Sequence, residues 1–443
     1  MNYLYLILSI VLLSSCAVKK DTLNVKKSDE ITGNIRVVES ITELDTISQD
    51  VSRYTKDIEE KLFSQKIYEK NYFRIWNIDK SKISLSTAMW ADRAYRYGDT
   101  YGENLQLLKA SFFDKVLDNS NYKNYLTLNK KALTIKSLNI RAIPTDKPVL
   151  RDPSKAGEGF PFDYLQNSTI SANKPILISH YSKDREWVFI ESSFAFGWVK
   201  SSGVVKIENK YTKLWQQAEQ VFITKENIPI YSMNNDFLFK SKIGMMFALI
   251  DEDSDSYSIL TVSRYKNMKP LYLKSKVKKS IAHKNRLAFN SENINKIITE
   301  VSKTNYGWGG MYSQRDCSST LRDFYAPFGL WLPRNSSQQA KIGKVISIDG
   351  LSDSKKIDII LKNAKPFRTL LYKKGHIGLF VSNKNKKIIM YQNVWGVKTQ
   401  KNGVEGRFII GKPIFSTLEV GSNLSDYDKD ASMLHKLKSI STL

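Results

Sequence analysis

One cysteine in the last third of the chain has the surroundings of a nucleophile. Cys317 follows Asp316 in the run RDCSS, a few residues after the glycine-rich run YGWGG of 306–310. Aspartate is a favoured N-cap residue, so the pattern predicts that a helix begins at Cys317. The positive end of a helix dipole favours the thiolate, which is the nucleophilic form of cysteine. The alternative is an ordinary buried cysteine, which the polar neighbours disfavour.

A nucleophilic cysteine needs a base, and the chain contains four histidines. His376 stands in the alternating run KGHIGLFV of 374–381, which predicts a strand with apolar residues on one face and His376 on the other. His376 is therefore the predicted base. The alternative is a histidine with a structural role on a strand face. Structural or solvated positions are expected for the remaining three, His180, His283 and His435.

A third residue should hold the imidazole in the required tautomer. The run IIMYQNVWG of 388–396 follows a turn and is expected to pair with the His376 strand as a hairpin. Alternation places Gln392 and Asn393 on opposite faces, so only one of them can reach the imidazole. Either amide oxygen can accept a hydrogen bond from the ring N–H.

The only other cysteine, Cys16, follows an apolar N-terminal stretch. Residues 1–15 have the length and composition of a secretory signal peptide and are too short to span a membrane as a mature helix. The run LSSC of 13–16 resembles a bacterial lipobox, which implies cleavage before Cys16 and lipid attachment there. A simple secretory signal is the alternative, because no Lys or Arg precedes the apolar stretch. If Cys16 is lipidated, Cys317 has no disulfide partner and is a candidate reactive thiol.

The 443 residues exceed what one hydrophobic core usually organises, so several domains must position these groups. After a polar tether (16–45), a helical segment (46–125) is indicated by near-helical apolar spacing from Val51 to Phe63 and over 105–117. Short strands between Pro and Gly turns predict small β-barrels at 126–205 and 206–283. Residues 284–425 would form the catalytic domain, with an amphipathic helix over 291–302, and 426–443 a polar extension without a clear role.

The charge balance indicates an anionic partner. There are 68 Lys and Arg against 44 Asp and Glu, a net charge of +24. Such a surface suits a cell-wall polymer or a membrane surface. Nucleic acid is disfavoured because an exported chain rarely meets it, and scattered surface lysines are the plain alternative.

Four sequence blocks resemble those of the NlpC/p60 family of cell-wall cysteine peptidases and occur in that family's order. They are YGWGG (306–310), RDCSS (315–319), LPRNS (332–336) and GHIG (375–378). The resemblance implies a multidomain α+β protein with a papain-like catalytic domain. The Trp-Val pairs and the loop FPFDYLQ (160–166) resemble bacterial SH3-type domains, and 46–125 resembles the stabilising segment of some family members.

The same resemblance implies roles for individual residues. Cys317 would attack a peptide carbonyl, His376 would act as base and then acid, and Gln392 would take the third position, where relatives often have His. Tyr306 would polarise the tetrahedral oxygen together with the Cys317 amide. The substrate side, where relatives bind the free amine of an L-alanine ahead of D-glutamate, would be lined by Asp316, Ser318 and Ser336.

The sequence thus predicts a monomeric, lipid-anchored endopeptidase of the cell envelope, on the periplasmic face of the outer membrane. It would cut peptidoglycan stem peptides between γ-D-glutamate and the diamino acid through a thioester. No cofactor is expected, and no Cys/His cluster has the spacing of a zinc site. The alternatives are a non-catalytic wall-binding lipoprotein that uses its barrels, and an amidase or acyltransferase on the same fold.

Overall fold

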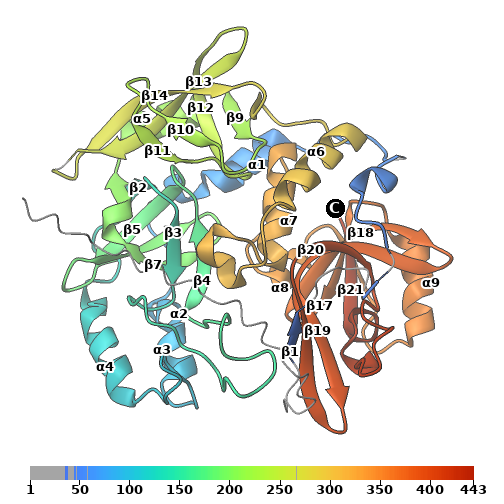
Figure 1. The fold of residues 1–443 in the computed structure, drawn as a ribbon. Helices are drawn as coiled ribbons and strands as arrows, with labels where there is room; N and C mark the ends of the chain where they lie inside the picture. Colours follow the sequence, from blue (N-terminus) through green and yellow to red (C-terminus); the bar gives the residue numbers. More distant parts are fainter. Residues whose placement is uncertain (1–34, 38–43, 46, 57, 266) are drawn as a thin grey trace, which may run out of the picture. The chain divides into compact units, whose positions relative to one another are not determined.

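The computed structural model describes residues 35–37, 44–45, 47–56, 58–265 and 267–443. The predicted signal peptide, the lipidation of Cys16 and most of the tether lie outside these described residues. Within them, the chain forms helices and largely antiparallel sheets, arranged as two SH3-like units and one α+β domain (Figure 1). No helix of the described part is both long and apolar enough to cross a membrane.

The α+β domain contains a seven-stranded sheet with the order β1-β20-β19-β18-β17-β21-β16. Its neighbouring strands are antiparallel except β1 and β20, which are parallel. The strands are β1 (Ile35–Val37), β16 (Lys344–Ser347), β17 (Thr369–Lys373), β18 (His376–Lys384), β19 (Lys387–Lys401), β20 (Val404–Thr417) and β21 (Leu437–Thr442). The central strand β18 therefore carries His376 at its first residue.

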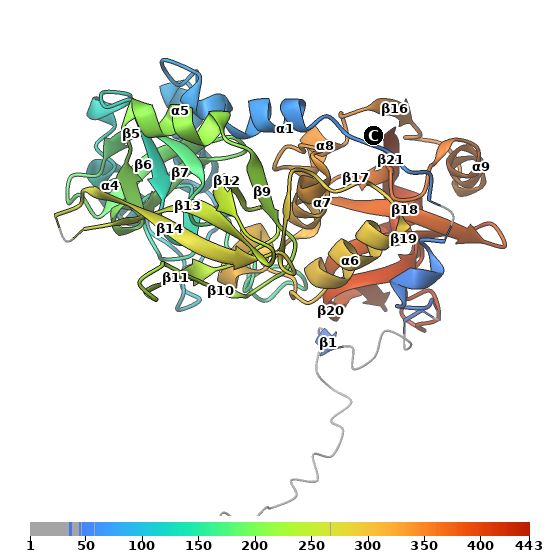
Figure 2. The same cartoon turned by 90° about the horizontal axis from the view of Figure 1, so that it is seen from above.

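Helices cover both faces of this sheet. Helix α6 (Ser291–Val301) and helix α7 (Cys317–Tyr325) share one apolar core with Ile377 and Leu379 of β18 (Figure 2). Helix α9 (Asp353–Asn363) and helix α10 (Met433–Lys436) pack on the opposite face. The short helix α8 (Ser336–Gln339) follows the LPRNS block. Successive apolar side chains of β18 pack alternately in the two cores, as expected for a central strand.

The first SH3-like unit is a seven-stranded sheet with the order β4-β3-β7-β6-β5-β2-β8. Its apolar side chains form a core of their own. The long loop between β3 and β4 contains the FPFDYLQ run and reaches the α+β domain, where Trp308 donates to the Asp163 carbonyl at 2.9 Å. The strands are β2 (Lys130–Thr134), β3 (Leu138–Arg141), β4 (Gln166–Ile170), β5 (Pro175–Tyr181), β6 (Trp187–Ser192), β7 (Phe196–Lys200) and β8 (Val204–Lys206).

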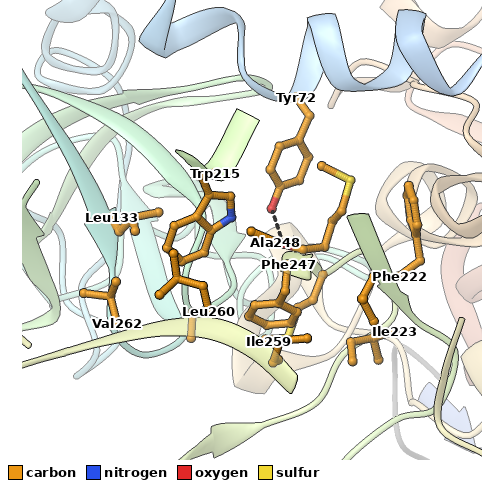
Figure 3. Packing of buried hydrophobic residues seen from close by; sticks show 14 of the residues in the cluster. Tyr72, Leu133, Trp215, Phe222, Ile223, Phe247, Ala248, Ile259, Leu260 and Val262 are labelled. Carbon is orange, nitrogen blue, oxygen red and sulfur yellow. Dashed lines mark hydrogen bonds between the residues drawn. The ribbon is translucent and has the colours of Figure 1, made fainter. Parts of the chain in front are cut away.

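The second SH3-like unit combines a five-stranded sheet, β14-β13-β12-β9-β15, with the hairpin β10-β11. Helix α5 (Asn209–Gln217) leads into it, and its Trp215 is fully buried in the core shown in Figure 3. Tyr72 of the N-terminal segment donates to the Met246 carbonyl at 3.3 Å there. The strands are β9 (Gln220–Ile223), β10 (Pro229–Tyr231), β11 (Phe237–Lys240), β12 (Met246–Glu252), β13 (Ser256–Arg264), β14 (Pro270–Lys278) and β15 (Ala282–Lys284).

The N-terminal segment is less helical than predicted. Near-helical spacing after Val51 corresponds only to a short 3-10 turn, Val51–Arg53, and both Val51 in this turn and Phe63 beyond it are buried in the α+β core. The helix expected over 105–117 begins at Ala110, since Leu105 has a φ of 62° that a helix excludes. The helices here are α1 (Gln65–Tyr72), α2 (Leu85–Ala88), α3 (Trp90–Tyr95) and α4 (Ala110–Asn119).

Both ends of the described chain belong to the α+β domain, which corrects two expectations. The last residues of the expected tether are structured: β1 pairs with β20, Leu44 is buried, and Asp45 accepts from the Thr417 amide at 2.8 Å. The expected polar extension contains β21, which lies between β17 and β16. Leu437 and Ile440 of β21 are fully buried, so this segment completes the sheet and its core.

Candidate functional site

The predicted nucleophile stands at the first residue of a capped helix. The Asp316 carboxylate accepts from the Ser319 amide at 2.9 Å, and the Ser319 hydroxyl accepts from the Asp316 amide at the same distance, a reciprocal capping box. Cys317 carries a free thiol whose residue is 8% exposed. Cys317 packs in the same core as Ile377, the residue that follows His376, and the Ile377 backbone amide is close enough to lower the pKa of the thiol.

The predicted base is oriented by a chain of three hydrogen-bonded residues. His376 Nε2 and Gln392 Oε1 are 2.7 Å apart. Gln392 Nε2 donates to Ser416 Oγ at 2.7 Å, and Ser416 Oγ donates to the Thr417 carbonyl at 2.9 Å. Since Ser416 uses its proton on the carbonyl, it must accept from the amide nitrogen, and the amide oxygen then faces the imidazole. His376 therefore carries its proton on Nε2, and Nδ1 is free to accept one.

In the structure, one of the two candidate amides faces the imidazole and the other has a different role. Gln392 faces His376, whereas Asn393 points to the opposite side of β19. Asn393 Nδ2 donates to the Arg315 carbonyl at 2.8 Å and to Thr320 Oγ1 at 2.9 Å. One strand thus orients the imidazole with one residue and fixes the start of the nucleophile helix with the next.

Burial favours the neutral form of both the thiol and the imidazole, and it acts against the helix dipole, which favours the thiolate. Burial and the neighbouring Asp316 carboxylate raise the pKa of Cys317 to about 12, and they outweigh the effects of the Ile377 amide and the Arg334 charge. Burial and the Lys373 charge lower the pKa of His376 to about 4. A neutral imidazole beside a neutral thiol can remove the proton only as the sulfur attacks.

Tyr306 is close enough to Cys317 and Asp316 for their side chains to influence its pKa. Its ring packs on Trp395 with a centroid distance of 5.8 Å, and its backbone is held by Gly411 and by a bridge to Arg315. Burial raises the pKa of Tyr306 well above its ordinary value, and the neighbouring Cys317 and Asp316 side chains add to the effect. The phenol therefore stays protonated and can donate a hydrogen bond to a developing oxyanion.

A buried arginine that the sequence did not single out organises the predicted substrate side. Arg334 Nη2 and Asp316 Oδ2 are 2.6 Å apart, and Arg334 Nη1 donates to Ser318 Oγ at 2.9 Å. Burial alone would raise the pKa of Asp316, but the Arg334 charge holds it below its ordinary value. Arg334 also donates to Ser168 Oγ of the first SH3-like unit at 2.7 Å. Ser336 begins α8 and is half-buried, and no hydrogen bond from its side chain joins it to the described residues of this cluster.

The residue before the cap links the site to the second SH3-like unit. Arg315 is fully buried and donates to Glu226 Oε1 at 2.6 Å and to Asp323 Oδ2 at 2.8 Å. Glu226 lies between β9 and β10 and also accepts from the Ile243 amide at 2.9 Å. Two carboxylates from different parts of the chain therefore neutralise one guanidinium next to the nucleophile.

The glycine-rich turn holds the first SH3-like unit against the site. Gly309 and Gly310 have φ values of 57° and 81°, and a Cβ at either position would lie 2.3 Å from the Gln166 carbonyl oxygen or 2.6 Å from Thr169 Oγ1. Thr169 Oγ1 donates to the Gly310 carbonyl at 2.6 Å. Only glycine permits both this left-handed backbone and this close approach.

A hollow of about 350 Å³ opens on the imidazole side of the site. Its walls include His376, Gln392, Tyr306 and Trp308, and Phe162 of the first SH3-like unit. Asp316, Ser318 and Ser336 do not line it. Among the described residues, no three His, Cys, Asp or Glu side chains are placed to hold a metal ion.

Comparison with family models assigns four segments. Residues 303–405 match the NlpC/P60 family, and residues 5–125 match the N-terminal NLPC_P60 stabilising domain. Residues 148–200 match an SH3 domain of SH3b1 type, and residues 209–254 match an SH3 domain of SH3b2 type. The two SH3 matches fall in the two SH3-like units, and the NlpC/P60 match contains Tyr306, Cys317, His376 and Gln392.

Solved structures with the same fold include a novel NlpC/P60 endopeptidase from Photobacterium damselae subsp. piscicida. It is 21% identical over 94% of this chain and 99% of its own, with a TM-score of 0.75. An NlpC/P60 family protein from Bacillus cereus is 14% identical over 70% of this chain and 99% of its own, with a TM-score of 0.45. Comparison with curated proteins found no match.

Proposed function

Since the chain carries an NlpC/P60 cysteine peptidase domain together with two SH3b domains, as a peptidoglycan hydrolase does, we propose that it is an endopeptidase of murein stem peptides. The bond cleaved is the one between γ-D-glutamate and the diamino acid. The observation that carries the proposal is the juxtaposition of the Cys317 sulfur with the start of β18, where Gln392 holds the His376 ring.

The reaction follows from the protonation states of these groups. His376 Nδ1 takes the thiol proton as the Cys317 sulfur attacks the γ-carbonyl carbon, because both groups begin neutral. The developing oxyanion accepts from the Tyr306 hydroxyl and the Cys317 amide. Gln392 Oε1 keeps its hydrogen bond to Nε2–H while the ring is positively charged.

Collapse of the tetrahedral intermediate breaks the C–N bond. The imidazolium returns its proton to the leaving amine of the diamino acid, and a thioester remains on Cys317. His376 then removes a proton from water, which attacks the thioester carbonyl. The thiolate leaves, takes back the proton from the ring, and the free γ-carboxylic acid is released.

The substrate side suits an N-terminal amine. Asp316 is buried, and the Arg334 charge keeps its carboxylate ionised. Asp316 and Ser318 therefore offer oxygen acceptors beside the nucleophile, within a shell that Arg334 and Ser168 hold in place. We assign to them the free amine of the L-alanine that precedes γ-D-glutamate. Ser336 is kept as a further candidate contact at the start of α8.

The decisive experiment uses defined tripeptides with a free or an acetylated N-terminus. Wild type should release the diamino acid from the free-amine peptide, whereas Cys317→Ala should release none. The acetylated peptide should be cleaved much more slowly. Wall binding by both proteins without any cleavage by wild type would instead indicate a non-catalytic wall-binding protein, and products with a new acyl acceptor would indicate a transferase.

We propose for the N-terminus that lipid attachment at Cys16 anchors the protein to the periplasmic face of the outer membrane, with the protein acting as a monomer. The carrying observation is the LSSC run after an apolar stretch. Wild type should label with radioactive palmitate and fractionate with membranes, and Cys16→Ser should do neither. Equal membrane association of the two proteins would overturn the anchor.

A further inference from the structure

The hollow beside His376 contains two cations that form no ion pair with a carboxylate of the described residues. Lys373, the last residue of β17, and Arg407, on β20, both line it and are both half-buried. Across the part of the chain that the structure describes, neither side chain forms an ion pair; Lys373 donates only to the Ala431 carbonyl at 3.2 Å. Cations with restricted access to solvent are normally paired, so these two are placed for an anion that the described residues do not supply.

Burial lowers the pKa of Arg407 although the charges of Glu405, Glu158 and Asp428 act against it, and none of these three carboxylates forms an ion pair with Arg407. Asp428 also lines the hollow, but it lies 3.5 Å from Lys398, which pairs with Glu405 as well. Glu158 accepts from the Tyr164 hydroxyl at 2.9 Å. Burial lowers the pKa of Lys373, and the Arg407 charge lowers it further, so the two cations repel each other across the hollow. Binding of an anion would offset both the cost of burying the two cations and the repulsion between them.

The first SH3-like unit shapes the arginine side of this hollow. Gly157, in the long loop between β3 and β4, lies against the Arg407 guanidinium, where a Cβ would lie 2.4 Å from Nε. Gly157 has a φ of 80°, so the position favours glycine for its backbone as well as for space. The loop therefore lies directly against the guanidinium that lines the hollow.

The hollow lies on the side where the leaving group must be. The imidazole returns its proton to the departing amine, so that amine has to be adjacent to His376. His376 lines the hollow, whereas the residues assigned to the N-terminal amine of the substrate do not. The released amino acid would thus enter the hollow, whose volume of about 350 Å³ is that of a small-ligand site.

We propose that Lys373 and Arg407 form a carboxylate-binding subsite for the residue on the leaving-group side of the cleaved bond. This proposal rests on the proposed function and specifies its substrate class. The ligand is an amino acid that bears a carboxylate within reach of its newly freed amine. That carboxylate has two sources: the side chain of a dicarboxylic diamino acid such as meso-diaminopimelate, or the α-carboxylate of a stem peptide that ends at this residue.

The test compares four tripeptides that differ only in the third residue. That residue is meso-diaminopimelate or L-lysine, each with a free or an amidated α-carboxylate. Wild type should cleave the peptides with a carboxylate in the preferred position with a kcat/KM about ten- to a hundredfold above that for amidated lysine, because charge-assisted hydrogen bonds are the strong ones. The peptide with amidated diaminopimelate keeps only the side-chain carboxylate, and the peptide with unamidated lysine keeps only the α-carboxylate. Whichever of these two is cleaved with the higher kcat/KM identifies the carboxylate that is bound.

The matched variants are Lys373→Gln, Arg407→Gln and Lys374→Gln. Lys374 is exposed next to Lys373 and does not line the hollow, so its variant loses the same charge without touching the subsite. The first two variants should lose the preference and cleave every peptide at the rate for amidated lysine, and Lys374→Gln should keep it. Equal cleavage of all four peptides by wild type, or a Lys373→Gln protein that behaves like Lys374→Gln, would overturn the subsite.

A binding measurement separates this proposal from the peptidase activity itself. Free meso-diaminopimelate and L-lysine are titrated into the Cys317→Ala protein by ligand-observed NMR. If the side-chain carboxylate is the one bound, diaminopimelate should bind more tightly than lysine, and Arg407→Gln in the same background should remove the difference. If the α-carboxylate is the one bound, the two amino acids should bind equally and Arg407→Gln should weaken both. If wild type cleaves nothing but either of these results is found, the proposed function fails and the subsite stands. Equal binding of the two amino acids overturns a side-chain carboxylate site.

Discussion

Each functional side chain of the site is held in its orientation by a second side chain. Gln392 orients His376, and Ser416 fixes which end of the Gln392 amide faces the ring. Arg334 holds Asp316 and Ser318 on the other side of the nucleophile. Local patterns in the sequence indicated Cys317 and His376 and left Gln392 and Asn393 as alternatives, between which the resemblance to the NlpC/p60 family favoured Gln392. The sequence could not indicate Ser416 or Arg334, because their partners lie far away in sequence; Ser168, for example, is 166 positions from Arg334.

Replacement of Ser416 tests the orientation of the amide. Ser416→Ala leaves Gln392 free to turn its nitrogen toward the ring, so kcat should fall about three- to tenfold, the value of one net hydrogen bond, with KM little changed. Steady-state kinetics on the free-amine tripeptide measure this. Ser441→Ala is the control, because Ser441 is buried in the same sheet but donates to the Ile342 carbonyl. An equal loss in both variants would contradict an orienting role.

The pH dependence follows from the lowered pKa of His376. The ring must be neutral to accept the thiol proton, and its pKa is about 4, so kcat/KM should be flat above about pH 5 and fall only toward pH 4. An unperturbed histidine would place the fall near pH 6.5. The measurement is kcat/KM from pH 3.5 to 8. Since the Lys373 charge contributes to the lowering, Lys373→Gln should move the fall to higher pH and Lys374→Gln should not.

At the scale of elements, the sequence predicted the pieces that have a local signal. The helix beginning at Cys317, the helix at 291–302 and the hairpin that carries His376 all form as expected, because capping and alternation are local properties. The segment after Val51 was mispredicted as helical, since its apolar residues are buried by a different domain. Strand β21 was missed because its partners β17 and β16 are distant in sequence.

The glycine-rich turn connects two elements, and one substitution tests the connection. Gly310→Ala should destabilise the protein by more than the roughly 1–2 kcal/mol that a left-handed alanine costs, because the new Cβ also meets Thr169 Oγ1 at 2.6 Å. Urea unfolding and kcat/KM should both respond, since the turn follows Tyr306. Gly350→Ala is the control: its φ is 75°, but nothing lies within 4 Å of a Cβ there. Equal losses would show that the contact with β4 is unimportant.

At the scale of the whole molecule, charged residues join the SH3-like units to the peptidase domain. Arg334 reaches Ser168 in the first unit, and Arg315 reaches Glu226 in the second. Both arginines flank the nucleophile in space. The sequence indicated the two barrels and the peptidase domain as separate units. It could not show that the site is shared among them, since such contacts depend on how folded surfaces meet.

The buried ion pair between Arg315 and Glu226 should contribute strongly to the stability of the contact between the peptidase domain and the second SH3-like unit. Glu226→Gln removes one of the two charges that neutralise a fully buried guanidinium, so the free energy of unfolding should fall by about 3–5 kcal/mol. Chemical denaturation measures this. Glu219→Gln breaks an exposed pair with Lys284 in the same unit and should cost less than about 1 kcal/mol. Similar losses in the two variants would contradict the assigned role of the buried pair.

The Arg315 contact also limits how this architecture can be rearranged. A peptidase domain cut free, or recombined with barrels from another enzyme, would keep its interior guanidinium but lose the carboxylate of Glu226. Such a hybrid is expected to be less stable unless an acidic residue occupies the equivalent place or a neutral residue replaces Arg315. The domains of this protein are therefore not expected to be exchangeable for those of other proteins without a loss of stability.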